Sequence, residues 1–318
     1  MYRVGVDLGG TNISVGVIDE NLNIIGRGKL KTNLPRSFDE IFSDIVKAVH
    51  MAVEDAGISM NDVLSIGAGT PGAVDLESGV VEFSSNLNFY NAPFKSELEK
   101  AFGKPAFVTN DANCAALAEK MLGTGKGVKD FIAITLGTGI GGGIFINDKM
   151  LTGVNGAAGE TGHMVIQTEG IKCGCGRKGC WEKYASATAI VQQTKDALLK
   201  DNYKKSYIWN LIDNDISKVN GRTAFDAMRN CDELGTRIVE KYIYYLACGI
   251  TNLINVFQPQ AFCIGGGMSN EGDALLLPVV EMVEKERYSI HSSKQTKICI
   301  AELKNDAGVI GAALLNEI

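Results

Sequence analysis

Two similar glycine-rich segments constrain the fold of this chain more than any other feature. Residues 8–19 read LGGTNISVGVID, and they align without gaps with residues 136–147, which read LGTGIGGGIFIN. Each segment is typical of a strand, a glycine turn and a second strand, because apolar residues flank glycines that permit tight turns. The repetition predicts two similar lobes. The alternative is that two glycine-rich hairpins resemble each other by chance.

The remaining sequence predicts an α/β protein, because stretches typical of strands alternate with amphipathic stretches typical of helices. The expected strands are 2–7, 13–18, 23–30, 63–68, 106–109, 131–136, 143–146, 261–264 and 297–301. The expected helices are 37–56, 94–102, 112–121, 233–256, 271–286 and 306–316, with further helical pattern between 183 and 233. We expect a small α/β lobe over residues 1–120, completed by the C-terminal helix 305–318. A large α/β lobe would cover residues 121–304 and contain a loop at 160–182.

Composition excludes several classes of protein. The chain has 318 residues, of which 45% are apolar, so it can bury a sizeable core. It contains no apolar run of about eighteen residues, and its first residues lack the pattern of a signal peptide, so we expect no membrane span and no secretion. The net charge of −6 argues against sequence-independent nucleic-acid binding, which depends on basic side chains.

The eight cysteines are unevenly placed. Five of them lie in apolar stretches and are predicted to be small core residues: Cys114, Cys231, Cys248, Cys263 and Cys299. The other three, Cys173, Cys175 and Cys180, follow His163 closely, and three thiolates with one imidazole complete a tetrahedral shell around a structural zinc ion. The alternative is a loop with free thiols. Clustered cysteines without a secretion signal indicate a reducing cytoplasm.

Three glycine-rich turns are candidates for nucleotide binding. Asp7 precedes Gly9, Gly10, Thr11 and Asn12, whose N–H groups and side chains suit anionic oxygens, although an ordinary hairpin remains the alternative. Residues 137–142 match G-x-G-x-x-G, but a strand follows where dinucleotide binding requires a helix. Two strand-bounded turns therefore favour a nucleoside triphosphate over NAD. The glycines at 265–267 suit the flat face of a purine, or else form only a tight strand-to-helix turn.

Asp111 is the candidate general base. It follows a predicted strand and starts a predicted helix, so the alternative role is a helix N-cap. An ionised carboxylate at this position is suited to accept a proton from an attacking hydroxyl. Glu160 and Glu182 flank the His/Cys cluster and are suited to hydrogen-bond a polyhydroxylated substrate.

With these residues assembled, the chain resembles the ROK family of sugar kinases and repressors, most of all its glucokinases. The resemblance covers nearly the whole chain. The motifs that carry it are DLGGTN at 7–12, GTPGAVD at 69–75, FVTNDANCAALAE at 107–119, ITLGTGIGGGI at 134–144, NGAAGETGHM at 155–164, CGCGRKGCWEKYAS at 173–186 and GGGMS at 265–269.

The resemblance implies an α/β, actin-like (ribonuclease H-like) two-lobed ATPase fold and transfer of the ATP γ-phosphate to a hexose, most simply glucose, with Mg²⁺. It implies that Asp111 is the base and that His163 serves both zinc and sugar. The sugar-binding set it implies is Asn110, Asp111, Glu160, His163 and Glu182, with Gly72 and Asn86 as further contacts. The ATP-binding set it implies is Asp7, Gly9, Gly10, Thr11, Asn12, Gly137, Thr138, Gly266 and Gly267. The family also implies a homodimer.

Two alternative functions stay open at this point. The family's kinases for N-acetylmannosamine, fructose, allose and glucosamine share the core motifs, so the sequence favours glucose without selecting it. The family's transcriptional regulators share the sugar-binding body, but they carry a DNA-binding region ahead of the DLGGTN-like segment. Because Asp7 lies so near the start of this sequence and the net charge is −6, we expect no nucleic-acid partner.

Overall fold

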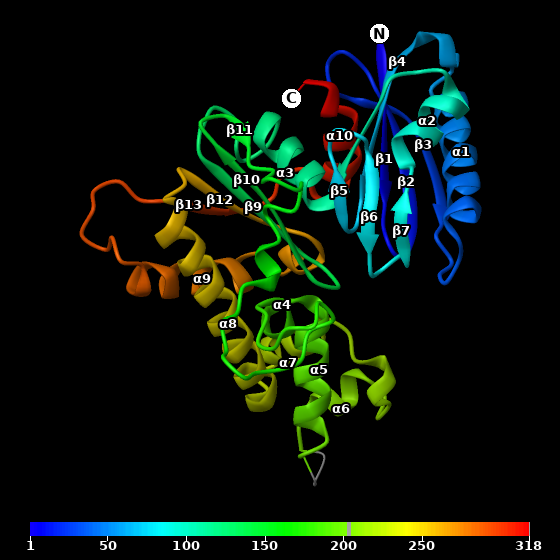
Figure 1. The fold of residues 1–318 in the computed structure, drawn as a ribbon. Coiled ribbons are helices and arrows are strands. Elements are labelled where there is room, and N and C mark those ends of the chain that lie inside the picture. The colour runs from blue at the N-terminus through cyan, green and yellow to red at the C-terminus, as the bar shows by residue number, and fades with distance from the viewer. Residues whose placement is uncertain (202–204, 318) are drawn as a thin grey trace. The chain divides into compact units, whose positions relative to one another are not determined.

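The computed structural model describes residues 1–201 and 205–317 (Figure 1). The strands in these residues are β1 (Tyr2–Leu8), β2 (Asn12–Ile18), β3 (Ile24–Lys31), β4 (Val63–Thr70), β5 (Ala73–Asp75), β6 (Val80–Ser84), β7 (Phe89–Ala92), β8 (Ala106–Asn110), β9 (Phe131–Leu136), β10 (Ile140–Ile146), β11 (Lys149–Met150), β12 (Ala261–Gly265) and β13 (Lys297–Ile300). The helices are α1 (Phe38–Asp55), α2 (Phe94–Phe102), α3 (Asp111–Met121), α4 (Glu182–Ala185), α5 (Ala187–Leu198), α6 (Ile208–Leu211), α7 (Thr223–Arg229), α8 (Glu233–Phe257), α9 (Asp273–Glu286) and α10 (Ala307–Ala313).

The contacts divide the chain into two compact units. Unit 1 comprises residues 1–133, 142–159 and 302–318, and unit 2 comprises residues 134–141 and 160–301. The division between the units crosses β9 and β10, so it differs from the boundary at residue 120 that we drew from the sequence. The two lobes that we expect from the sequence, 1–120 with 305–318 and 121–304, stay a prediction.

A five-stranded sheet with the order β3-β2-β1-β4-β8 forms the centre of unit 1. The first three strands pair antiparallel, whereas β4 and β8 extend the sheet in parallel, which brings the carboxyl ends of β1, β4 and β8 to one edge. Helix α1 packs against β2 and β3, and α10 packs against β1, β4 and α3. The C-terminal helix, red in Figure 1, thus completes the part of the fold that the first strands begin.

A second five-stranded sheet has the order β11-β10-β9-β12-β13. When the five strands of each sheet are numbered in the order in which they occur along the chain, both sheets have the same spatial order, 3-2-1-4-5. The hairpin of β1 and β2 and the hairpin of β9 and β10 occupy equivalent positions in the two sheets. The predicted internal repeat is therefore a repeat of topology, and the α/β fold class is confirmed.

Local sequence explains where helix α1 begins and which face it buries. Ser37 caps its N-terminus by accepting from the N–H of Glu40, and the Glu40 carboxylate accepts from the N–H of Ser37 in return. Apolar residues recur at spacings of three and four, so Ile41, Ile45 and Val49 are all buried against the sheet.

Two parts of the fold differ from what we expected. A small sheet with the order β5-β6-β7 occupies residues 73–92, where we predicted no element. Its strands are three to five residues long, too short for a clear alternation of apolar and polar residues. Strand β10 also begins at Ile140, three residues before the predicted start, since glycines in a strand weaken its sequence signal.

The scattered cysteines are not all core residues. Cys114 and Cys263 are buried and Cys248 and Cys299 are partly buried, but Cys231 is exposed, so its predicted core position is wrong. Cys231 adopts a left-handed backbone conformation (φ 59°) in the turn between α7 and α8. Its nearest neighbours in the sequence, Asn230 and Asp232, are polar, which is consistent with an exposed turn.

Candidate functional site

Asp111 is the first residue of α3, at the carboxyl end of β8. The residue that caps this helix is Asn110, whose side-chain oxygen accepts a 2.8 Å hydrogen bond from the N–H of Ala112. Asp111 Oδ1 accepts a hydrogen bond from the same N–H, also at 2.8 Å. Asn110 therefore occupies the N-cap position, and the role of Asp111 as base stays a prediction.

Asp7 and Cys114 lie close to Asp111 in unit 1, and each affects or shares its electrostatic environment. Burial raises the pKa of Asp111, and burial followed by the charge of Asp111 raises the pKa of Asp7 to about 6. Burial also raises the pKa of the Cys114 thiol, one turn along α3, so this cysteine stays neutral beneath the two acids. Both residues are only partly buried.

Two glycines allow the backbone to approach these acids. A Cβ atom on Gly69 in β4 would lie 2.9 Å from Cys114 Sγ and 3.3 Å from the Cα of Asp111. A Cβ atom on Gly308 in α10 would lie 2.7 Å from Asp7 Oδ2. Neither glycine was predicted as a site residue, because nothing in the local sequence shows which side chain a glycine will face.

The predicted sugar contacts Gly72 and Asn86 have different surroundings. Gly72, at φ +114°, accepts a 3.1 Å hydrogen bond at its carbonyl from the Asn110 side chain, so it lies beside the start of α3. Asn86 is exposed in the turn between β6 and β7. The structure therefore joins Gly72 to Asn110 and Asp111, whereas no contact joins Asn86 to them among the described residues.

The first predicted phosphate turn links β1 to β2. The N–H of Gly9 donates to the carbonyl of Asn12, which closes the turn at 2.9 Å, and Gly10 and Thr11 at its tip are exposed. In the second turn, between β9 and β10, the N–H of Gly137 donates to the carbonyl of Gly139 at 3.0 Å. Because β10 follows directly, the dinucleotide interpretation of residues 137–142 has no helix to support it.

The predicted adenosine turn follows β12. Gly266 adopts φ +80°, and a Cβ atom there would lie 2.5 Å from the N atom of Leu136, so the turn requires glycine. Gly267 begins a short 3-10 helix that ends at Glu271. The buried Glu271 carboxylate pairs with Arg229 of α7, a contact that the sequence did not reveal and that holds this helix in place.

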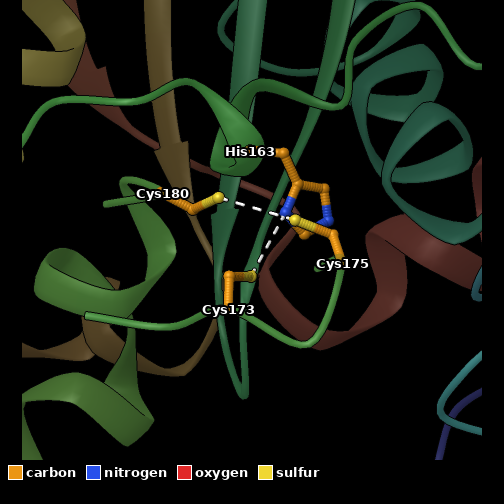
Figure 2. A group of neighbouring side chains, drawn as sticks. All are labelled: His163, Cys173, Cys175 and Cys180. Atoms are coloured by element: carbon orange, nitrogen blue, oxygen red, sulfur yellow. Dashed lines mark hydrogen bonds between the residues drawn. The ribbon is translucent and has the colours of Figure 1, made fainter. Parts of the chain in front are cut away.

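The four predicted zinc ligands converge in unit 2. The donor atoms of His163, Cys173, Cys175 and Cys180 all lie within 4.8 Å of one another (Figure 2). Cys173 Sγ lies 3.7 Å from His163 Nδ1, and Cys175 Sγ lies 3.6 Å from Cys180 Sγ. Two sulfur atoms bound tetrahedrally at 2.3 Å from Zn²⁺ would be about 3.8 Å apart. The donor set and its spacing therefore fit a tetrahedral metal ion.

The two nitrogen atoms of His163 face different groups. Nδ1 faces the cysteines, as Figure 2 shows, whereas Nε2 lies 3.8 Å from Glu160 Oε2. Glu182 borders the same cluster, since its Oε1 accepts a 3.2 Å hydrogen bond from Cys173 Sγ. A Cβ atom on Gly139 would lie 2.5 Å from Glu182 Oε2, so this carboxylate also borders the second glycine turn.

Trp181 anchors this region and was not among the predicted site residues. It is fully buried between Cys180 and Glu182, and its Nε1–H donates a 2.8 Å hydrogen bond to the carbonyl of Tyr245 in α8. Its backbone N–H donates to the carbonyl of Met164, next to His163. The tryptophan therefore joins the two segments that carry His163 and Glu182.

The predicted site residues thus form groups within each unit. Unit 1 holds Asp7, Gly9, Gly10, Thr11, Asn12, Gly72, Asn86, Asn110 and Asp111. Unit 2 holds Gly137, Thr138, Glu160, His163, Cys173, Cys175, Cys180, Glu182, Gly266 and Gly267.

A repeated sheet topology with glycine turns at equivalent hairpins and a carboxylate at a strand end defines the class of protein, an actin-like ATPase fold. The chain belongs to the ROK family, whose model matches residues 3–317. It is similar to a glucokinase of Thermotoga maritima, with 36% identity over 315 residues, which cover 98% of this chain and 95% of the relative.

The chain is also similar to a solved glucokinase structure and to a transcriptional repressor. The structure is a ROK family glucokinase of Streptomyces griseus in complex with glucose and AMPPNP, with a TM-score of 0.88, 35% identity and coverage of 99% of each chain. The regulator is a xylose repressor of Caldicellulosiruptor bescii, with 30% identity over 309 residues, which cover 97% of this chain and 76% of the repressor. In the part of this chain that the structure describes, no helix combines the length and apolar character needed to cross a bilayer.

Proposed function

We propose that this protein transfers the γ-phosphate of ATP to the 6-hydroxyl of glucose, giving glucose 6-phosphate and ADP. The similarity to glucokinases over nearly the full chain supports this activity. The observation that carries the proposal is the position of Asp111. Its carboxylate stands at a strand end, next to Asp7 and the first glycine turn.

In the proposed reaction, Asp111 acts as the general base. Its carboxylate accepts the proton of the 6-hydroxyl while the hydroxyl oxygen forms a bond to the γ-phosphorus atom. The bond from that phosphorus to the β–γ bridging oxygen breaks, and its electron pair leaves with ADP. Because burial raises the pKa of Asp111, its proton affinity moves toward that of a base that works near neutral pH.

The sugar and nucleotide contacts remain proposals. Asn110, Glu160, His163, Glu182 and Gly72 would bind the sugar hydroxyls, and Asn86 is a further proposed contact. Gly9, Gly10, Thr11, Asn12, Gly137 and Thr138 would bind phosphates, and Gly266 and Gly267 would flank the adenosine. A partly exposed carboxylate beside a phosphate turn fits Mg²⁺, so Asp7 would hold it directly or through water. The ion would neutralise the charge of the phosphate groups.

We propose that the His/Cys cluster binds a structural zinc ion. All four positions of a tetrahedral shell are filled by His163, Cys173, Cys175 and Cys180, so none remains for a reactive water. The ion would fix the His163 ring through Nδ1 and leave Nε2 facing Glu160, toward a substrate.

We also propose the wider context that the family suggests. The protein would act in the cytoplasm, where reduced thiols are stable, and would supply glucose 6-phosphate to glycolysis. It would form a homodimer and have no nucleic-acid partner.

A coupled assay of ADP formation over a panel of sugars tests the proposed function. The panel contains glucose, mannose, fructose, allose, glucosamine and N-acetylmannosamine, each with ATP and Mg²⁺. We expect the highest kcat/KM for glucose. A higher value for another hexose would reassign the substrate while keeping Asp111 as base. Sugar binding by calorimetry without any turnover would instead favour a sugar-responsive regulator, the function of the repressors that the chain also resembles.

A further inference from the structure

Thr32 lies directly behind the first glycine turn. It follows the last residue of β3, and its side chain is fully buried. Its Oγ1–H donates a 2.7 Å hydrogen bond to the carbonyl of Gly9, and its backbone N–H donates a 3.1 Å hydrogen bond to the carbonyl of Thr11. One buried residue therefore holds two carbonyl groups of the turn that we assign to phosphate binding.

We infer that Thr32 is a positioning residue that orients the N–H groups of the 9–12 turn toward the phosphates of ATP. The inference rests on the proposed function. In a trans peptide unit, the C=O of one residue and the N–H of the next point in opposite directions. Since the Gly9 carbonyl points at Thr32, the Gly10 N–H points away from it.

The tip of the turn has the properties that this role requires. Gly10 and Thr11 are exposed, and within the described residues their N–H groups donate to no acceptor. A turn with the Gly9 carbonyl facing inward and the Gly10 N–H facing outward is suited to anionic oxygens. If the Gly9 carbonyl were released, its peptide unit would be free to rotate and would present a partial negative charge to the phosphates.

Thr32 is itself held from behind. Its carbonyl accepts a 3.4 Å hydrogen bond from Arg36 Nη1, and the same nitrogen lies 2.7 Å from Asp44 Oδ2 in α1. On the other side, Lys31 Nζ donates a 2.9 Å hydrogen bond to the Asn12 side chain. The segment that contacts the turn is thus anchored to a long helix, so it forms a rigid support.

The second turn is held in a related way by backbone alone. The N–H of Ala187 donates a 2.9 Å hydrogen bond to the carbonyl of Gly137, so the Thr138 N–H points away from Ala187. In the first turn a side-chain hydroxyl makes the equivalent contact, so its orientation is testable by substitution.

The test compares Thr32→Val with Thr32→Ser in the full chain. Valine keeps the volume and the backbone N–H but removes the hydroxyl, whereas serine keeps the hydroxyl. We expect Thr32→Val to lose about 3- to 10-fold in kcat/KM for ATP, the size of one ordinary hydrogen bond, while KM for the sugar changes little. Thr32→Ser should retain most of the wild-type value. Affinity for AMPPNP, measured by calorimetry, should fall in parallel.

Thr194→Val is the matched control. Thr194 is equally buried, and its hydroxyl also donates to a carbonyl, that of Ile190 in α5, but it lies in no proposed site. We expect it to leave KM for ATP unchanged. If Thr32→Val does not fold, Thr32→Cys replaces it, and the weaker thiol donor should give an intermediate loss.

Three results would overturn the inference: wild-type ATP kinetics in Thr32→Val or in its cysteine replacement, an equal loss in Thr32→Ser, or an equal rise in KM for sugar and ATP. These results differ from failure of the proposed function, which would appear as absence of sugar phosphorylation by the wild type. In that case AMPPNP affinity still compares the Thr32 variants, and absence of any AMPPNP binding by the wild type overturns both.

Discussion

The carboxyl groups of Asp7 and Asp111 lie close enough for the charge of Asp111 to add to burial in raising the pKa of Asp7 to about 6. Asp7 near the end of β1 and Asp111 at the start of α3, directly after β8, therefore share one partly buried edge of a sheet. This arrangement costs stability when both are ionised, and we attribute its presence to the cation and the substrate that they would bind.

We expect Asp7→Asn to stabilise the metal-free protein at pH 8. The pKa of Asp7 is higher in the folded chain than its ordinary value of 3.8, so its contribution to stability is complete below about pH 4 and is lost as the pH rises through 6. A shift of about two units corresponds to about 3 kcal/mol, and solvent contact should reduce the measured gain to about 1–2 kcal/mol.

Urea unfolding in EDTA at pH 8 and pH 4 measures this effect. The gain in free energy of unfolding should appear at pH 8 and vanish at pH 4. Asp39→Asn, the same change at an exposed position, should shift stability by less than about 1 kcal/mol at either pH. A variant of Asp7 that is less stable than wild type at pH 8 would contradict the assigned pKa shift.

We expect Asp111→Asn to abolish most turnover while leaving glucose binding nearly intact. Asparagine keeps the shape and hydrogen bonds of the side chain but cannot accept the hydroxyl proton, so kcat should fall about 10²–10⁴-fold. Steady-state kinetics and calorimetric titration with glucose provide the two measurements. Turnover above about 1% of the wild-type rate would remove Asp111 from the role of base.

We expect Cys175→Ser to lose the bound zinc. Cys175 is an exposed ligand, so its substitution removes a thiolate without opening a cavity. Elemental analysis should fall from about one zinc per chain to a small fraction, and KM for glucose should rise because the His163 ring loses its support. Cys231→Ser, at an exposed cysteine outside the cluster, should retain both the zinc and the wild-type KM. Full zinc content in Cys175→Ser would contradict the assignment.

We expect Gly249→Ala to destabilise the protein only while Trp181 is present. A Cβ atom on Gly249 in α8 would lie 2.1 Å from the indole ring, so the substitution should cost about 1–3 kcal/mol despite the better helix propensity of alanine.

A double-mutant cycle with Trp181→Leu isolates that contact. In the leucine background, Gly249→Ala should be neutral or stabilising, which gives a coupling energy of at least about 1 kcal/mol in chemical denaturation. If the two substitutions change the free energy of unfolding additively, the packing of the Trp181 ring does not require glycine at position 249.

Much of the fold could be predicted because its signals are local. The spacing of Ile41, Ile45 and Val49 predicts the buried face of α1, and the repeated glycine hairpins predict the duplicated topology. The short strands β5 to β7 were missed because three to five residues carry too little pattern. Cys231 was misassigned although its polar neighbours, Asn230 and Asp232, are typical of a turn.

The sequence by itself determined the chemical inventory of this protein: the glycine turns, the acid at the start of α3, and four candidate metal ligands within a short segment. Only the tertiary structure decided which group does what. It placed Asn110 at the N-cap and Asp111 at the first helical position of α3, put Thr32 behind the first turn, and packed Trp181 against Gly249. These relationships join residues that are distant in the chain, and the packing of sheet and helix, rather than local preference, brings them together.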